Sequence, residues 1–290
     1  MPECHVDRRQ FLACAAGAAF ASGAAAEEAV PKFIDVHTHM GTDKFGLTVD
    51  DYLKWMDKYG VERVCVLPLV SKEAATQLRS PELGFEAAKA HPKRFIPFCA
   101  VEPRDEFPGG VKQLVGILER YQERGAKALG EHKVGLPFAD PLMMRVYEAC
   151  ATVDLPVLFH MDKIRGTDDD ERSGLQRALD KFPKLTFIGH GPGWWGAGLP
   201  FLDALMKKYP NIYGDISADS GRTTLGKDMK AGRDFMIRRA DRLLFGTDYF
   251  LRNHHLETGH FKLLAAMDLP AEVKAKIYRG NAIKLLKLES

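Results

Sequence analysis

Short runs of apolar residues, rich in β-branched and aromatic side chains, recur along the chain from residue 33 onward. Runs of this length and composition are typical of buried β-strands. We distinguish eight of them, at residues 33–38, 62–67, 95–101, 126–131, 156–160, 185–190, 211–217 and 242–248. The longer segments between them mix apolar and polar positions with a helical period. The pattern therefore predicts a chain in which strands and helices alternate.

Helix start and stop signals support this alternation. Thr48 precedes the amphipathic segment VDDYLKWMDKY, and Gly60 follows it. Ser80 and Asp140 each stand before a proline that opens a further amphipathic segment, and Gly125 ends the segment VKQLVGILERYQER. Hydroxyl and carboxylate caps at the start and glycine at the end are the residues that helix termini favour.

Strands that alternate with helices predict a parallel sheet. Eight such units fit a closed (β/α)8 barrel, the TIM-barrel fold of about 250 residues, better than an open doubly wound sheet. The glycine-rich fingerprint of dinucleotide-binding sheets is absent from the turn after the first strand. We expect one α/β domain over residues 27–290, with a last helix at 271–286 that closes the chain against the barrel.

Residues 1–26 differ from the rest of the chain. Arg8 and Arg9 precede Phe11 and Leu12, and a short alanine-rich stretch follows that ends in small residues at 24–26. This order resembles a twin-arginine export signal, and the alternative is an alanine-rich terminal helix. We expect cleavage after residue 26 and delivery of the mature protein to the periplasm.

The composition of the chain indicates which kinds of molecule it can bind. The 290 residues are 46% hydrophobic and carry a formal charge of +2, which gives no electrostatic bias toward nucleic acid. No apolar run approaches the roughly 20 residues of a membrane span, so we expect no membrane anchor in the mature form. Cys65, Cys99 and Cys150 lie in apolar segments without paired spacing, as buried thiols do. A small-molecule substrate is the expected partner, and a homo-oligomer is compatible.

Five polar residues stand at the C-terminal ends of four predicted strands or directly after them. They are His37, His39, His160, His190 and Asp248. Alternate residues of a strand share a face, so the two histidines of the FIDVHTHMG run can converge on one point. This end of a (β/α)8 barrel is where active sites lie. Imidazole and carboxylate donors suit Zn²⁺ or another divalent first-row ion, with an open position for water. Asp35 is expected to support the site rather than to bind the ion.

This constellation resembles the amidohydrolase superfamily, and within it the amidohydrolase-related branch. The resemblance covers residues 33–286 and includes the closing sequence YRGNAIKLL. It implies that His37, His39, His160 and Asp248 are metal ligands. It also implies that His190 is either a ligand of a second metal or the catalytic histidine. One or two zinc ions are expected, with manganese or iron as alternatives.

The fourth strand leaves the metal count open. Two-metal members of the superfamily often have a carboxylated lysine or a glutamate there as a bridge, and the segment GAKALGEHK offers Lys127, Glu131, His132 and Lys133. Its A-L-G-E run resembles that of deoxyribonuclease-like hydrolases, whose Gly-Glu supplies a metal ligand. Alternation does not settle which residues face inward, because Ala128 and Gly130 can do so together with His132. Glu131 is therefore either a bridging ligand or a partner in an ordinary ion pair.

The implied function is that of a metal-dependent hydrolase. Bound Zn²⁺ lowers the pKa of its water to about 7, and the resulting hydroxide can attack a small amide, lactone or ester. Asp248 then accepts the proton, while His190 holds a second ion or stabilises the developing negative charge. One alternative keeps a single metal and uses His190 as the acid/base of a non-oxidative decarboxylase or hydratase of a small aromatic or unsaturated acid. Another is a non-catalytic ligand-binding barrel.

Five further residues are candidates for substrate contacts. Lys163 or Arg165, soon after the fifth strand, can meet a substrate carboxylate, although an acidic run follows them. Trp194, in the GPGWWG run, can form an aromatic wall or simply pack the loop. Asp215 and Arg222 lie at or after the end of the seventh strand, where they can bind a polar group or stabilise the turn.

Overall fold

The computed structural model describes residues 32–41, 46–74, 78–252 and 254–289. The predicted export signal, at residues 1–26, lies outside these residues. The described part of the chain from residue 32 onward forms one compact unit. None of its helices combines the length and the apolar character that crossing a membrane requires.

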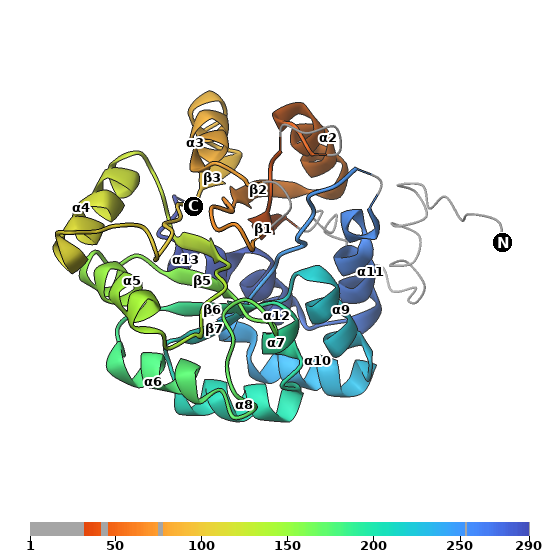
Figure 1. Ribbon diagram of the computed structural model, residues 1–290. Coiled ribbons are helices and arrows are strands. Elements are labelled where there is room, and N and C mark those ends of the chain that lie inside the picture. Colours follow the sequence, from red (N-terminus) through yellow and green to blue (C-terminus); the bar gives the residue numbers. More distant parts are fainter. Residues whose placement is uncertain (1–31, 42–45, 75–77, 253, 290) are drawn as a thin grey trace, which may run out of the picture. The chain divides into compact units, whose positions relative to one another are not determined.

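Eight parallel strands form the centre of this unit, as the sequence predicted (Figure 1). They are β1 (Phe33–Thr38), β2 (Val61–Val66), β3 (Phe95–Pro97), β4 (Leu129–His132), β5 (Val157–His160), β6 (Phe187–His190), β7 (Ile212–Asp215) and β8 (Leu243–Leu244). Their order follows the chain, β1 to β3 in one ladder and β4 to β8 in another. Backbone bridges from Cys99 to Leu129 and from Thr38 to Tyr249 join the two ladders. The result is a closed (β/α)8 barrel, the TIM-barrel fold.

Helices surround the strands in Figure 1. They are α2 (Val49–Tyr59), α3 (Pro81–Ala90), α4 (Gly110–Glu123), α5 (Pro141–Thr152), α6 (Ser173–Lys181), α7 (Pro192–Trp195), α8 (Leu199–Lys208), α9 (Ala218–Gly226), α10 (Met229–Arg238), α11 (Gly259–Met267), α12 (Ala271–Ala275) and α13 (Asn281–Leu285). Short 3₁₀ turns lie at Ala240–Arg242 and His255–Glu257, and a π-helical turn at Lys276–Gly280 links α12 to α13.

The predicted helix caps are present. The Thr48 hydroxyl accepts a hydrogen bond from the Asp51 backbone, and the Asp51 carboxylate accepts one from the Thr48 backbone in return. Gly60 ends α2 with a φ of 72°, a left-handed conformation that glycine adopts without steric cost. The side chains of Ser80 and Asp140 cap α3 and α5 by accepting hydrogen bonds from the backbone N–H groups of Glu82 and Leu142.

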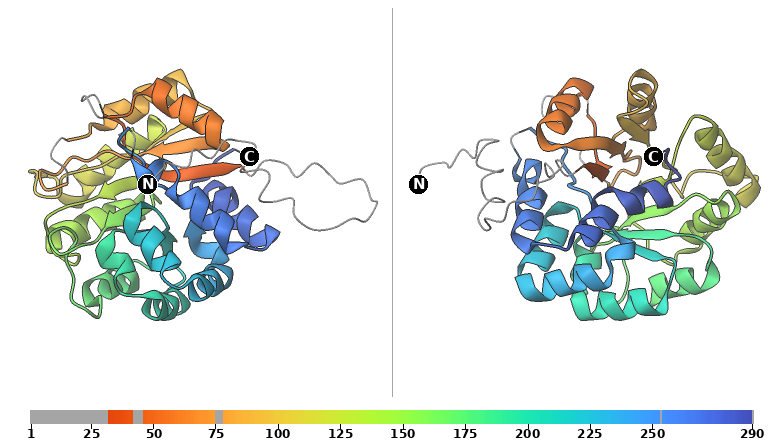
Figure 2. Two further views of the ribbon diagram at one scale, coloured as in Figure 1. Left: turned by 90° about the vertical axis from the view of Figure 1, so that its right-hand side faces the viewer. Right: turned by 180° about the vertical axis from the view of Figure 1, so that it is seen from behind.

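Two layers of apolar side chains hold the barrel together. The inner layer fills the barrel with residues such as Ile34, Cys65 and Leu158, and it includes Ala282 and Leu286 from the end of the chain. The outer layer lies between the strands and the helices. Seen from behind in Figure 2, the C-terminal helices lie across one end of the barrel. In this fold functional sites lie at the opposite end, at the C-termini of the strands.

Candidate metal centre

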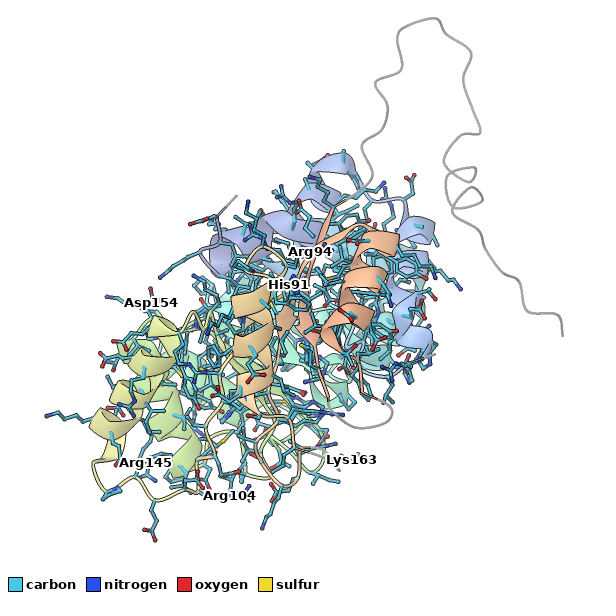
Figure 3. All side chains as sticks on the ribbon, turned by 90° about the horizontal axis from the view of Figure 1, so that it is seen from above. His91, Arg94, Arg104, Arg145, Asp154 and Lys163 are labelled. Carbon is cyan, nitrogen blue, oxygen red and sulfur yellow. The ribbon has the colours of Figure 1, made fainter. Side chains whose placement is uncertain are left out.

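The loops after the strands gather at one end of the described unit (Figure 3). Arg104 follows β3 and Lys163 follows β5, and both lie at this end, whereas His91 and Arg94, which precede β3, lie toward the other. The predicted site residues belong to the same end as Arg104 and Lys163, because each lies at the C-terminal end of its strand or just after it.

His37 and His39 converge at the end of β1. Their Nε2 atoms lie 3.2 Å apart, and both side chains are almost completely buried. The Asp35 carboxylate does not join them. It accepts hydrogen bonds from the His37 backbone and from the backbone and hydroxyl of Thr247, so it ties β1 to the segment after β8.

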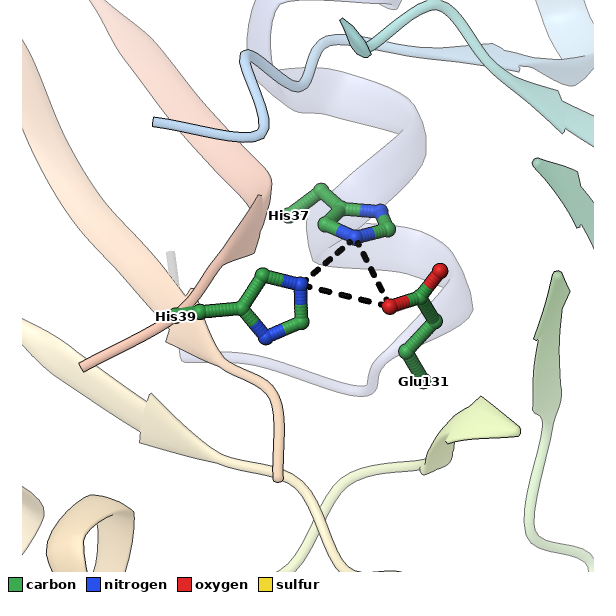
Figure 4. A group of neighbouring side chains, drawn as sticks. All are labelled: His37, His39 and Glu131. Carbon is green, nitrogen blue, oxygen red and sulfur yellow. Dashed lines mark hydrogen bonds and ion pairs between the residues drawn. The ribbon is translucent and has the colours of Figure 1, made fainter. Parts of the chain in front are cut away.

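The Glu131 carboxylate lies between two pairs of histidines. Its Oε2 is 3.3 Å from His39 Nε2 and 3.9 Å from His37 Nε2 (Figure 4). Its Oε1 is 2.6 Å from His160 Nδ1 and 3.6 Å from His190 Nε2. One carboxylate oxygen therefore faces the histidines of β1, and the other faces those of β5 and β6.

His132, the neighbour of Glu131, points out of the barrel. Its ring packs against Tyr147, and its Nε2 lies 3.2 Å from the sulfur of Met143, both on α5. The question that alternation left open at β4 is thereby answered: Glu131 faces the interior and His132 faces the helices. Gly130, with a φ of 150°, makes room for this arrangement, because a Cβ there would lie 2.5 Å from the Leu158 carbonyl oxygen.

Each of the four histidines has its other ring nitrogen held by a partner outside the group. In the tautomer that fits, His37 Nδ1 donates to Asp215 (2.5 Å), His39 Nδ1 to the Leu67 carbonyl (2.8 Å), His160 Nε2 to Asp162 (2.8 Å) and His190 Nδ1 to Ser217 (3.0 Å). These bonds leave Nε2 of His37, His39 and His190 and Nδ1 of His160 directed at Glu131. Metal-binding histidines are oriented by outer partners of this kind.

Asp248 completes the group from the segment after β8. Its Oδ1 lies 3.5 Å from His39 Nε2 and 3.8 Å from His37 Nε2. Its backbone has a φ of 58°, uncommon for a residue other than glycine, and its N–H donates to the His37 carbonyl. The Asp248 side chain is 18% exposed, the largest exposed fraction in the group.

The electrostatics of the group favour positive charge at its centre. Burial raises the pKa of the Glu131 carboxyl, but the charges of Lys133 and His160 outweigh burial and hold that pKa well below its usual range. The pKa of Asp215 is likewise low despite burial, because of the His37 charge. Burial lowers the pKa of His37, yet the charges of Asp215, Asp248 and Glu131 raise it to about 9. Burial and the His37 charge lower the pKa of His190.

These residues fit a divalent metal. Glu131 Oε2 is buried and accepts no hydrogen bond among the described residues, and its ion pair with Lys133 Nζ is long, at 3.5 Å. A buried carboxylate oxygen that accepts no hydrogen bond is costly. Three sets of ligand atoms each lie within 4.8 Å of one another. They are His37 with His39 and Glu131, His37 with His190 and Asp248, and Glu131 with His160 and His190. Imidazole nitrogen and carboxylate oxygen are the donors that zinc and its first-row neighbours accept.

The five candidates for substrate contacts lie in different surroundings. Lys163 is exposed, whereas Arg165 is bound to the Asp162 carboxylate and to the Glu73 carbonyl. Arg222 pairs with Asp219 on α9.

Trp194 and Asp215 take the structural alternatives that the sequence left open beside a substrate contact. Trp194 is 1% exposed and packs against Phe159, and a Cβ on Gly189 would lie 2.4 Å from its ring. The indole therefore fills the outer layer of the core instead of forming a wall of the site. Asp215 is fully buried behind His37, where it orients the imidazole and is out of reach of a substrate.

Sequence reasoning assigned the orienting role to none of the four groups, because Asp215 was a candidate for substrate contact and the other three were not singled out. The Leu67 carbonyl carries no sequence signal at all. Ser217 lies two residues after Asp215, and Asp162 two residues after His160. A short polar side chain two positions beyond a strand-end residue was the available signal for both.

Comparisons with known proteins agree with this architecture. The family model described as amidohydrolase matches residues 34–288. An uncharacterised TIM-barrel protein from Bordetella bronchiseptica is 18% identical, with a TM-score of 0.67 over 88% of this chain and 98% of that one. An amidohydrolase from Burkholderia multivorans with bound zinc is 12% identical, with a TM-score of 0.62 over 89% and 100%. A 2,6-dihydroxybenzoate decarboxylase from Rhizobium is 17% identical, with a TM-score of 0.58 over 88% and 98%.

At these identities the structural similarity establishes the shared fold alone. No curated protein matches the chain.

Proposed function

Because the chain belongs to the amidohydrolase family, we propose that it is a metal-dependent hydrolase whose site would hold two divalent ions, with Glu131 as a ligand that both would share. Its substrates are small amides, lactones or esters. His37, His39 and Asp248 hold one ion, and His160 and His190 hold the other. Zinc is the proposed metal because the donors are nitrogen and oxygen only, and manganese or iron are the alternatives.

The position of Glu131 carries this proposal. Two divalent ions about 3.5–4 Å apart repel each other strongly unless negative oxygen lies between them. Glu131, whose two oxygens face two different histidine pairs, would supply such oxygen to both ions. A site for one ion would not need the second oxygen of Glu131 to be directed at a second pair of histidines.

The residues of the site divide the work of hydrolysis. A bound divalent ion supplies Lewis acidity, which lowers the pKa of water to about 7 and polarises a carbonyl oxygen. Asp248 accepts the proton as the water oxygen bonds to the acyl carbon, since its carboxylate is the most exposed in the group. When the bond to the leaving nitrogen or oxygen breaks, Asp248 returns the proton to that atom. His190 is held by Ser217 with Nε2 toward Glu131, which favours a ligand over an acid.

The rival reaction is decarboxylation of a small aromatic acid on a single metal. Proteins with this activity share the fold, as the Rhizobium enzyme illustrates. In that reaction Glu131 would have no bridging role, so its place between the histidine pairs supports hydrolysis instead.

Incubation in ¹⁸O-labelled water distinguishes hydrolysis from decarboxylation. The protein, reconstituted with zinc, is incubated in ¹⁸O-water with a panel of lactones, esters and amides and with hydroxybenzoates. Hydrolysis incorporates one ¹⁸O atom into the carboxylic acid product and releases no CO₂. Release of CO₂ from a hydroxybenzoate, without turnover of the acyl compounds, would establish the decarboxylase in place of the hydrolase.

The metal count tests the bridge. Glu131→Ala should reduce bound zinc from two ions to one, measured by mass spectrometry of the metal, and hydrolysis should fall with it. The matched control is Glu62→Ala, which removes a partly exposed carboxylate of β2 that pairs with Lys32 and Arg279. A protein that holds one ion, and keeps that ion and its activity without Glu131, would contradict the two-metal site.

A further inference from the structure

We propose that Lys133 selects substrates that carry a carboxylate close to the bond that is attacked. This inference rests on the proposed function, because it assigns a substrate class to the same metal centre. Lys133 lies directly after β4, two residues beyond Glu131.

The ammonium of Lys133 lies at the edge of the metal centre. Its Nζ is 3.5 Å from Glu131 Oε2, the same oxygen that faces His39 and His37. His132, between the two, points the other way. The Lys133 side chain is 17% exposed, whereas that of Glu131 is fully buried, so Lys133 is the member of this pair that is open to solvent.

Two arginines at this end of the barrel are already paired, and Lys163 is exposed at the surface. Arg165 binds Asp162, and Arg104 binds both Glu73 and Glu102. Glu131 is the single carboxylate within ion-pair distance of Lys133 among the residues that the structure describes. Lys133 therefore depends for its charge balance on a carboxylate that the proposed metal ions also require.

Charge balance then favours an anionic ligand. When the Glu131 oxygens are shared with two divalent cations, little of the carboxylate charge remains for the ammonium. The ammonium and the cations repel each other at separations of a few ångströms in a largely buried site. A substrate carboxylate next to Lys133 restores the balance and forms a charge-assisted hydrogen bond.

Phe250 indicates which probes suit the site. Its ring lies 6.4 Å from the His39 ring and edge-to-face with it, and 5.8 Å from the ring of His254. Phe250 is partly exposed and lies two residues beyond Asp248. A planar ring with two carboxylates can therefore pack near Phe250 and present one carboxylate to the metals and the other to Lys133.

The experiment measures binding without turnover. Phthalate, isophthalate and terephthalate are titrated into the zinc-loaded protein by calorimetry, each beside the monoamide in which one carboxylate becomes a neutral carboxamide. The unchanged protein should bind at least one dicarboxylate about tenfold more tightly than its monoamide. Lys133→Met should remove this preference by weakening the dicarboxylate about tenfold while it changes the monoamide less than about twofold.

Two comparisons make the result specific. Lys127→Met, a change at a lysine just before β4, should leave the preference intact. Zinc content is read from the same samples and should stay unchanged in Lys133→Met. Equal weakening of both members of a pair, no preference in the unchanged protein, or loss of zinc in Lys133→Met would each overturn the inference. Because no turnover is required, hydrolysis without a carboxylate preference would overturn this inference alone.

Discussion

At the scale of single residues, the site is determined by what holds the far side of each imidazole. A histidine has two ring nitrogens, and the partner of one decides where the other points. Asp162 is such a partner. It accepts a hydrogen bond from His160 and is bound in turn by Arg165. Its pKa lies well below the usual range, because the hydrogen bonds from His160 and Arg165 outweigh its partial burial.

Asp162→Asn tests this orienting role. The variant keeps the size of the side chain but loses the charge that fixes His160 in the tautomer with Nδ1 toward Glu131. We expect zinc affinity at the His160 and His190 position to fall about 10- to 100-fold, measured by competition with a chelator. Asp169→Asn is the control, because Asp169 lies in the same loop and caps Ser173 instead. Unchanged zinc affinity in Asp162→Asn would show that His160 needs no carboxylate partner.

At the scale of elements, periodicity predicted where strands and helices lie. It was less successful in predicting which side chains of a strand point into the barrel. The strand starts and the capped helices follow from local signals, as Thr48 and Gly60 illustrate. The inward direction of Glu131 does not, because the pairing of β4 with β5 shifts register between Leu129 and His132. A shift of one residue reverses which side chains face the core.

The sequence alone also did not decide whether Trp194 faces the site or packs in the core. The GPGWWG run forms the short helix α7, and this turn carries the indole to the outer side of the strands. The ring fits there because Gly189 has no side chain. The gathering of histidines at one end of the barrel, in contrast, followed from their positions at strand ends, which the fold itself brings together.

Gly246 allows the segment after β8 to lie close to β1 and β7. A Cβ there would lie 2.7 Å from Asp215 Oδ1 and 3.2 Å from His37 Cβ. We expect Gly246→Ala to destabilise the fold by about 1–3 kcal/mol and to weaken zinc binding, since Asp215 and His37 must move. Gly116→Ala in α4 meets only an ordinary contact at 3.7 Å and should stabilise the fold by up to about 1 kcal/mol. Thermal unfolding and zinc titration of both variants measure these effects, and equal stabilities would contradict the steric argument.

At the scale of the whole molecule, the metal centre exists only when the barrel has closed. Its ligand candidates come from β1, β4, β5 and β6 and from the segments after β1 and β8, and all except Asp248 are at most 5% exposed. An unfolded chain holds these residues far apart, so loading with metal must accompany or follow folding. The exporter that the predicted leader addresses carries folded proteins, and we propose that the protein receives its metal in the cytoplasm and is then exported.

Replacement of both Arg8 and Arg9 by Lys tests this order of events. The paired arginines are the feature by which the twin-arginine route is addressed, and lysine keeps the charge without the guanidinium. We expect the variant to accumulate in the cytoplasm as an uncleaved precursor whose zinc content equals that of the exported protein, measured by mass spectrometry after cell fractionation. Equal zinc content matters because it would show that the closed barrel, and not the periplasm, is what the metal requires. A cytoplasmic precursor without zinc would place metal loading after export, and unchanged delivery to the periplasm would mean that residues 1–26 are not a twin-arginine signal.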